Sequence, residues 1–297
     1  MLAFGDITAQ KIVELERFPL DARWLIANAD PAVVAAEQPR LGDDFITPDG
    51  RLVIGVHSWL VRAGGLTILV DTCCGNGRER GTASPFHNLD TAYLANLARA
   101  GVAPEEVDIV FCTHLHVDHV GWNVMEKDGR FVPTFPNARY LFNPTDFEHR
   151  LAAEREGSGS PATRAAFTEC VVPIVEAGRA TFVEPGHDVL HEVDDMLRVV
   201  ALPGHCPGHC GLEIAGRGGH GLLTGDAIHH PLQLARPQWY CAADVDPDES
   251  ARTRRMLVER YGDTDTTLLT AHFGGTSAGR IVGRGGEAGF RFVDRPG

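Results

Sequence analysis

The stretch THLHVDHVGW, residues 113–122, constrains this chain more than any other part of its sequence. It places His114, His116, Asp118 and His119 close together, directly after an apolar, largely β-branched segment that is typical of a buried strand. Because side chains alternate along a strand, the first two histidines are expected to share one face. Buried histidine and carboxylate groups need polar partners. A divalent metal would supply them, and so dense a cluster has few other stable uses.

A second segment of potential ligands is PGHCPGHC, residues 203–210. His205 and His209 are four positions apart, as are Cys206 and Cys210, and this spacing resembles a small zinc knot. All four side chains can bind a metal. The segment alone leaves open which of them do.

The composition limits the classes of function. A formal net charge of −13 disfavours binding to nucleic acid and to anionic membranes, because both carry negative charge. The chain has no apolar run long enough for a transmembrane helix, and its N-terminal residues lack the pattern of a signal peptide. We therefore expect a cytoplasmic protein that acts on a small molecule, with no nucleic-acid or membrane partner.

The cysteine content argues against a disulfide framework, because the chain has seven cysteines and no secretory signal. The vicinal pair Cys73 and Cys74 is expected to be reduced, and a redox role for it stays open. With 43% hydrophobic residues, the 297 residues can bury the core of one large domain or of two small ones.

Periodicity and turn residues predict strands in hairpin groups with single helices between them. This pattern favours an α/β fold in which helices cover the outer faces of mixed sheets. Residues 16–48 lack clear periodicity and are expected to form an irregular N-terminal arm or lid. The predicted strands cover 51–71 (around a turn at 63–65), 107–114, 197–204, 211–226 (a hairpin), 267–272 and 281–293 (a hairpin). The predicted helices cover 90–100 (capped by Asp90 or Thr91), 144–156, the residues from the end of a loop at 157–161 to about 170, and 247–262.

The segment HLHVDH (114–119) matches the HxHxDH signature of the metallo-β-lactamase superfamily, and further motifs resemble that family in order along the chain. The resemblance runs from about residue 50 to residue 297. It implies a four-layer αββα sandwich, which we expect to form a single domain over 1–297. The other matching segments are DTCCGN (71–76), ALPGHCPGH (201–209), LLTGDA (222–227) and LLTAHF (268–273).

The resemblance implies a centre of two metal ions with seven ligands. Within the family turn, His205 is the ligand and His209 supports the turn, whereas Cys206 and Cys210 are not expected to bind metal. A set of histidines and carboxylates without thiolate suits Zn²⁺, and Mn, Fe or Co can also fit. One ion would take His114, His116 and His205, the other would take Asp118, His119 and His272, and Asp226 would bridge them.

Several positions bear on the branch of the family. An Asp at the bridging position, as at Asp226, is typical of the lactonase, phosphotriesterase, glyoxalase and nuclease branches. Antibiotic-cleaving members tend to have Cys or Ser near this position. His116 stands where flavodiiron oxygen reductases carry Glu. Members of the nuclease branch insert a large domain between the bridging Asp and the last His, and the segment from Asp226 to His272 is too short to hold it. Members of the glyoxalase branch add a helical domain after the last His, and the segment that follows His272 is expected to be too short for that domain. The chain thus resembles acyl-homoserine-lactone lactonases and the methyl-parathion-hydrolase group, to which HVDHVGWN (116–123) and GDAIHHP (225–231) look closer.

We expect a dinuclear-metal-dependent hydrolase of small neutral esters or lactones. A metal-bridging hydroxide would attack, and Asp118 would orient it and move its proton. The net charge of −13 favours neutral substrates over strongly anionic ones. The alternatives are a phosphotriester (organophosphate) hydrolase, a non-catalytic metal-binding sensor, and an iron-dependent oxidoreductase. Because relatives commonly dimerise, a homodimer is a further expectation.

Several residues that are not metal ligands are expected to lie near the metals. The family's lactonases have a Tyr three residues after the bridging Asp, and this chain has His229 there. His229 is the expected proton donor to the leaving group, with Tyr240 as the alternative, and His230 is expected to be structural. Four aromatic residues can either line a pocket or pack in the core, namely Phe86, Trp122, Phe135 and Trp239. Lone histidines are given no role, namely His57, His149, His187, His191 and His220.

Overall fold

The computed structural model describes residues 1–190 and 196–293. Its first sheet contains β1 (Leu2–Phe4), β2 (Ile7–Leu20), β3 (Leu52–Ala63), β4 (Leu66–Val70), β5 (Ile109–Phe111), β8 (Arg139–Phe142) and β9 (Ala180–Phe182). The second contains β10 (Met196–Ala201), β11 (Cys210–Gly216), β12 (Gly219–Leu223), β13 (Thr267–Leu269), β14 (Ala278–Val282) and β15 (Gly289–Phe292). A separate hairpin joins β6 (Val124–Lys127) to β7 (Arg130–Pro133).

Within the described residues, both sheets follow the chain order with one interruption. The first has the order β1-β2-β3-β4-β5-β8-β9, and the second runs from β10 to β15. Strands β4, β5, β8 and β9 pair in parallel, as do β12 and β13, and the other neighbours are antiparallel. The sheets are therefore mixed, as predicted.

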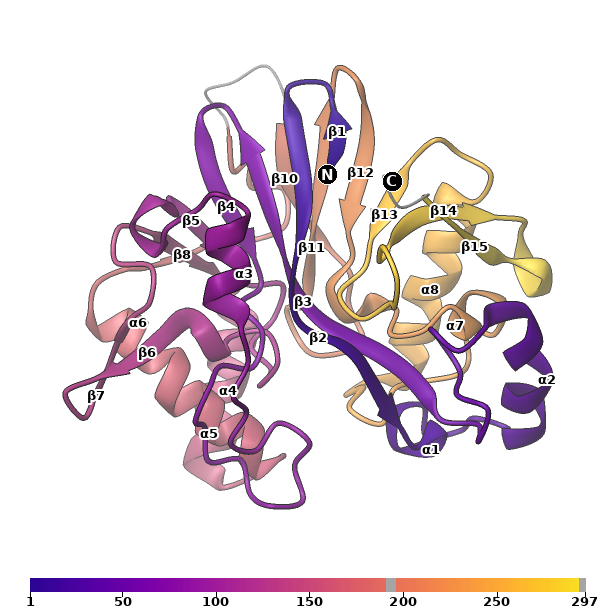
Figure 1. Ribbon diagram of the computed structural model, residues 1–297, viewed down its shortest axis with the longest axis horizontal. Helices are drawn as coiled ribbons and strands as arrows, with labels where there is room; N and C mark the ends of the chain where they lie inside the picture. Colours follow the sequence, from indigo (N-terminus) through magenta and orange to yellow (C-terminus); the bar gives the residue numbers. More distant parts are fainter. Residues whose placement is uncertain (191–195, 294–297) are drawn as a thin grey trace.

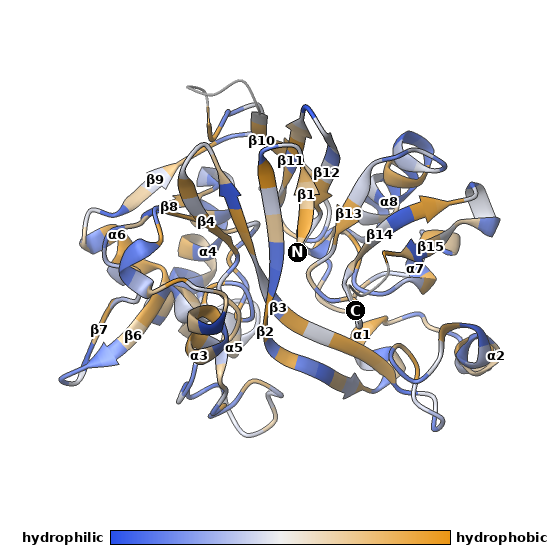
Figure 2. Ribbon diagram, turned by 45° about the horizontal axis from the view of Figure 1, so that its top comes forward, coloured by the Kyte–Doolittle hydropathy of each residue, from blue (hydrophilic) through white to orange (hydrophobic). Residues whose placement is uncertain are grey.

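The two sheets lie face to face in the centre, with helices outside each (Figure 1). The core between the sheets includes Trp59 and Val61 of β3 together with Leu212 and Ile214 of β11. In Figure 2 the central strands of both sheets are largely apolar, whereas the tip of the β6–β7 hairpin is hydrophilic. Burial of this apolar surface is the main favourable term that holds the layers together.

The helices form two outer layers. Helices α3 (Tyr93–Arg99), α5 (Pro161–Cys170) and α6 (Val172–Glu176) contribute buried residues to a core on the outer face of the first sheet, and α4 (Pro144–Glu156) packs beside them. Helices α1 (Ala22–Leu25), α2 (Pro31–Leu41), α7 (Leu232–Ala235) and α8 (Pro247–Tyr261) contribute to a third core beside the second sheet. The predicted αββα arrangement of mixed sheets flanked by helices is confirmed.

Local sequence signals account for the helices that were predicted most accurately. At the start of α4, the Asn143 side chain accepts hydrogen bonds from the backbone N–H groups of Thr145 and Asp146, and Gly157 ends the helix at φ 65°. At the start of α8, the Asp246 side chain accepts one from the N–H of Glu249. Proline occupies the first turn of both helices, where its missing N–H costs nothing.

Three predictions about elements are wrong. Residues 16–48 are not an irregular arm, because β2 runs to Leu20 and is followed by α1 and α2. Strand β2 lacks a clean alternation because its pairing with β3 shifts register twice along its length. Helix α3 begins at Tyr93, and neither Asp90 nor Thr91 caps it. The strand predicted over 107–114 ends at Phe111, so His114 and His116 lie on a loop.

The cysteines and the absence of long apolar helices in the described chain agree with the sequence, whereas several other expectations are not tested by the structure. All seven cysteines are free and buried. No helix within the described ranges is both long and apolar enough to cross a membrane. His191 lies outside the described residues. The single domain, the homodimer and the cytoplasmic location stay predictions.

Candidate metal centre

Loops that follow the strands bring the predicted metal ligands together. The loop 114–119 follows β5, and the remaining ligands follow β10, β12 and β13 of the other sheet. The ligand atoms form two groups, each with no more than 4.8 Å between its members: His114, His116, His205 and Asp226 in one, and Asp118, His119 and His272 in the other.

Three imidazole nitrogens converge in the first group. The Nδ1 of His116 lies 2.9 Å from the Nε2 of His114 and 2.8 Å from the Nε2 of His205. The Asp226 Oδ2 lies 3.7 Å from the same nitrogen of His114 and 3.4 Å from that of His205. One cation at this point would satisfy all four donor atoms, as in tetrahedral zinc sites.

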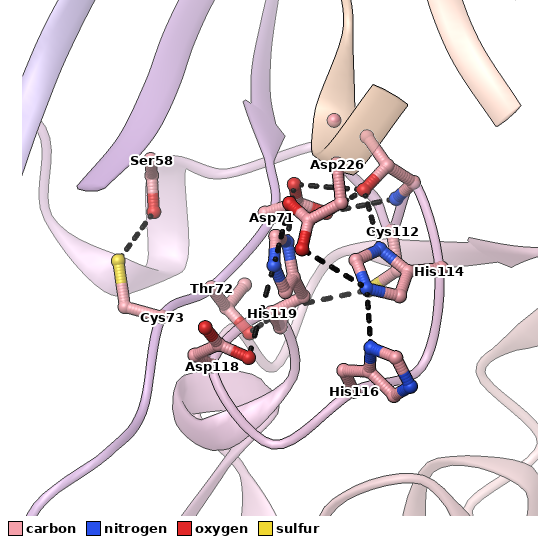
Figure 3. A network of polar contacts seen from close by, with 12 residues as sticks. Ser58, Asp71, Thr72, Cys73, Cys112, His114, His116, Asp118, His119 and Asp226 are labelled. Carbon is pink, nitrogen blue, oxygen red and sulfur yellow. Dashed lines mark hydrogen bonds and ion pairs between the residues drawn. The ribbon is translucent and has the colours of Figure 1, made fainter. Parts of the chain in front are cut away.

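The second group gathers around the other oxygen of Asp226. Its Oδ1 lies 3.2 Å from the Nε2 of His119 and 3.0 Å from the Nε2 of His272. The Asp118 carboxylate lies 3.8 Å and 3.7 Å from the same two nitrogens. Figure 3 shows Asp226 between His119 and His114, with Asp118 below. One carboxylate thus presents one oxygen to each group.

Hydrogen bonds hold the ring nitrogens that face away from the centre. Such bonds fix the orientation of a ring and the nitrogen that it offers to a metal. The contacts are His114 Nδ1 with Thr113 Oγ1 (3.1 Å), His119 Nδ1 with Asp71 Oδ2 (2.9 Å), His205 Nδ1 with Asp244 Oδ1 (2.8 Å) and His272 Nδ1 with the Gly55 carbonyl (2.9 Å).

The side chains fit a pair of divalent cations. The Nε2 of His119 and the Oδ1 of Asp226 are buried and make no hydrogen bond within the described chain, so both lack a partner that a cation would supply. Burial lowers the pKa of His114, His116 and His205, which keeps these rings neutral and able to bind a metal.

Four further residues that the sequence singled out are not part of the two ligand groups. His229 lies beside the centre, with its Nε2 3.0 Å from the Asp226 Oδ2. His209 supports the turn as predicted: its Nε2 accepts the Asp226 N–H at 2.9 Å and its Nδ1 bonds to the Leu202 carbonyl at 2.7 Å. Neither Cys206 nor Cys210 belongs to a ligand group in the described parts of the chain.

A cavity of about 870 Å³ opens onto the metal centre. Phe86 lines it, whereas Trp122 and Phe135 pack in the core of the first sheet, and Trp239 packs in that of the second. His229 lines the cavity, whereas Tyr240 is not among the described residues that do.

Sequence reasoning missed several residues of the site. Asp71 and Asp244 orient His119 and His205, yet neither was given a role. Asp71 lies in the DTCCGN motif, which was a usable signal, whereas the sequence around Asp244 carries none. The cavity is also lined by side chains to which no role was assigned, namely Arg80, His149, Arg150, Arg164 and Cys241.

Comparison with known proteins finds sequence relatives. The model of the Metallo-beta-lactamase superfamily matches residues 51–272. N-acyl homoserine lactonase AttM of Azorhizobium caulinodans is 28% identical over 194 residues, which are 63% of this chain and 66% of the relative. AttM of Agrobacterium fabrum is 25% identical with the same coverage. The match spans just under two thirds of the length of these relatives.

Solved structures of similar fold extend over the whole chain. Hydrolase AbOPH of the beta lactamase superfamily has a TM-score of 0.82 at 22% identity, covering 100% of this chain and 97% of the other. The dizinc quorum-quenching lactonase AidC, solved with a product, has a TM-score of 0.80 at 18% identity and the same coverage. These likenesses establish the shared fold.

Proposed function

The chain belongs to the metallo-beta-lactamase superfamily, and from this premise we propose that it is a dinuclear-metal-dependent hydrolase of small esters or lactones. The observation that carries the proposal is the position of Asp226, which offers one oxygen to each of two groups of histidines. The centre opens onto a cavity large enough for a small-molecule substrate.

The proposed ligands of the first metal are His114, His116 and His205, and those of the second are Asp118, His119 and His272. Asp226 is proposed as a ligand of both. Two divalent ions, for which we propose Zn²⁺, would supply Lewis acidity and an activated water when bound. Asp118 lines the cavity, where its carboxylate can orient that water and take its proton.

His229 is the proposed donor to the leaving group. Its Nε2 lies 3.0 Å from the Asp226 Oδ2, and its side chain lines the cavity, so it can reach a leaving group held at the centre. The water oxygen would bond to the carbonyl carbon, the ester C–O bond would break, and the leaving alkoxide would take a proton from His229. The products would be a carboxylic acid and an alcohol.

Lactones are the first substrates to test, because the curated relatives are N-acyl homoserine lactonases. A phosphotriester hydrolase is the alternative, since His229 replaces the Tyr expected of a lactonase and the same centre can polarise a phosphoryl oxygen.

The proposal is tested with protein stripped of metal by a chelator and then restored with zinc. Proton release is measured on lactones, aryl esters and phosphotriesters, and metal content is measured on the same samples. We expect the restored protein to hydrolyse lactones or esters and the stripped protein to have no activity. Activity on phosphotriesters alone would replace the proposed substrate class. A zinc-loaded protein without activity on any of them would instead favour a sensor.

His229→Gln is expected to lower kcat on an alkyl lactone by about 10²-fold, the lower end of general-acid contributions. An aryl ester should be affected less, because its leaving group needs no proton. Metal content should stay unchanged. Tyr240→Phe is the matched control, since Tyr240 does not line the cavity. A larger loss in Tyr240→Phe than in His229→Gln would reassign the donor.

A further inference from the structure

The cavity wall formed by α4, α5 and the loop before α3 contains three arginines. Arg150 of α4, Arg164 of α5 and Arg80 of the loop all line it. Among the described residues that line the cavity, the carboxylates are Asp118 and Asp226, both proposed metal ligands. Each of the three arginines pairs with a carboxylate that is not part of this lining: Arg150 with Asp146, Arg80 with Glu169 and Arg164 with Glu154. What the wall offers to a substrate therefore depends on the hydrogen bonds that each guanidinium still lacks.

Arg150 has a buried guanidinium that is only partly satisfied. The residue is 7% exposed, and its Nε donates to the Asp146 Oδ1 at 3.0 Å. The other oxygen of Asp146 accepts the Leu115 N–H at 2.7 Å, which ties this pair to the loop that carries the metal ligands. The Arg150 Nη2 is buried without a hydrogen-bond partner in the part of the chain that the structure describes, and the Cys206 thiol beside the guanidinium is only a weak acceptor. A buried charged donor without an acceptor is costly, so a bound acceptor would be strongly favoured there.

The other two arginines are less well placed to bind a substrate. The Arg164 Nη1 donates to the carbonyls of Ser158 and Gly159 at 3.0 Å and 2.9 Å. The Arg80 Nη1 pairs with Glu169 at 2.7 Å, and its Nε, like the Arg150 Nη2, is buried without a hydrogen-bond partner in the described chain. The Arg80 side chain is fully buried, however, whereas that of Arg150 is 8% exposed. Arg150 also lies close to the metal centre, because its partner Asp146 binds the backbone of Leu115, between His114 and His116, and Arg150 and His116 line the same cavity. It is therefore the cationic side chain best placed to contact a molecule held at the metals.

We propose that Arg150 binds a carboxylate of the substrate, so that the ester or lactone hydrolysed here carries a negative charge away from the scissile bond. This inference rests on the proposed function and replaces the expectation of a wholly neutral substrate. Hydrogen bonds between ionised partners are about twice as strong as neutral ones. A carboxylate thus fits the free Nη2 better than an amide carbonyl does.

The test compares homoserine lactones that differ only in the charge at the end of the acyl group. N-succinyl-, N-glutaryl- and N-adipoyl-homoserine lactone are each paired with the terminal carboxamide of the same length. For the zinc-loaded wild type we expect kcat/KM to favour the carboxylate by ~10-fold or more at one chain length, as a charged hydrogen bond predicts. Arg150→Met should remove this ratio, and Arg164→Met should keep it.

The double variant Asp146→Asn/Arg150→Met guards against misfolding, because it leaves no unpaired buried carboxylate and the introduced amide oxygen can still accept the Leu115 N–H. It should also lack the carboxylate preference. Equal rates for carboxylate and carboxamide at all three lengths in active wild type would overturn the inference. If the kcat/KM ratio of carboxylate to carboxamide stays unchanged in both Arg150 variants, the inference is overturned as well. Arg150 would then only stabilise the structure through its ion pair with Asp146.

If neither lactones nor esters are hydrolysed, the proposed function fails, and the role of Arg150 is then tested by binding. The probes are ring-opened N-adipoyl-homoserine and its terminal carboxamide, titrated calorimetrically into zinc-loaded protein. Tighter binding of the carboxylate that is lost in Arg150→Met would support the role of Arg150. Equal affinities for the two probes would reject it.

Discussion

Asp226→Ala is expected to lower kcat/KM on any substrate that the wild type hydrolyses by at least ~10²-fold. The reason is that its two oxygens serve both groups of histidines, at 3.0–3.4 Å from His119, His205 and His272. Without this carboxylate, both ions would lose a ligand and the negative charge that holds them close together. The measurement is kcat/KM together with the number of zinc ions bound per chain.

Asp265→Ala is the control for this variant, because the Asp265 side chain is 95% exposed and lies outside the site. It should keep wild-type activity and zinc content. An Asp226→Ala protein that binds two ions and retains activity would contradict the bridging role.

Gly121→Ala is expected to lower the free energy of unfolding by about 3 kcal/mol or more, since the clash cannot be relieved by a side-chain movement. A Cβ atom on Gly121 would lie 1.9 Å from the backbone carbon and oxygen of Cys74. The Gly121 N–H also donates to the Cys73 carbonyl at 2.7 Å, so the two segments cannot separate without losing this bond. Urea unfolding of metal-free protein measures the effect.

Gly286→Ala is the matched control, because no atom lies within 4 Å of the position of its Cβ. Its stability should stay within about 0.5 kcal/mol of wild type, as for most surface substitutions. A Gly121→Ala protein of equal stability would show that the backbone beside the ligand loop can move without cost.

Much of the fold could be predicted because its signals are local. Asn143 and Asp246, each followed by proline, mark the starts of α4 and α8. The hairpin between β11 and β12 is predicted by alternating residues around glycines. Strand β2 has no such signal, because its pattern depends on two register shifts against β3.

The metal centre could be predicted in part for the same reason. His114, His116, Asp118 and His119 are close in sequence, so their chemistry is visible without a structure. The expectation that strand alternation aligns the first two was wrong, since β5 ends at Phe111 and the ligand residues form a loop.

The sequence by itself determined most types of elements, the mixed α/β class and the ligand cluster at 114–119, because these depend on residue type and short spacing. The more distant candidate ligands His205, Asp226 and His272 followed from the resemblance to the family. Only the tertiary structure decided which side chains support the site. Asp244 reaches His205 across 39 positions, and Asp71 reaches His119 across 48. The same holds for the position of Arg150 beside the cavity. Loops from the two sheets come into contact there only when the layers pack together. Net charge and local periodicity do not predict such contacts between residues that are distant in sequence.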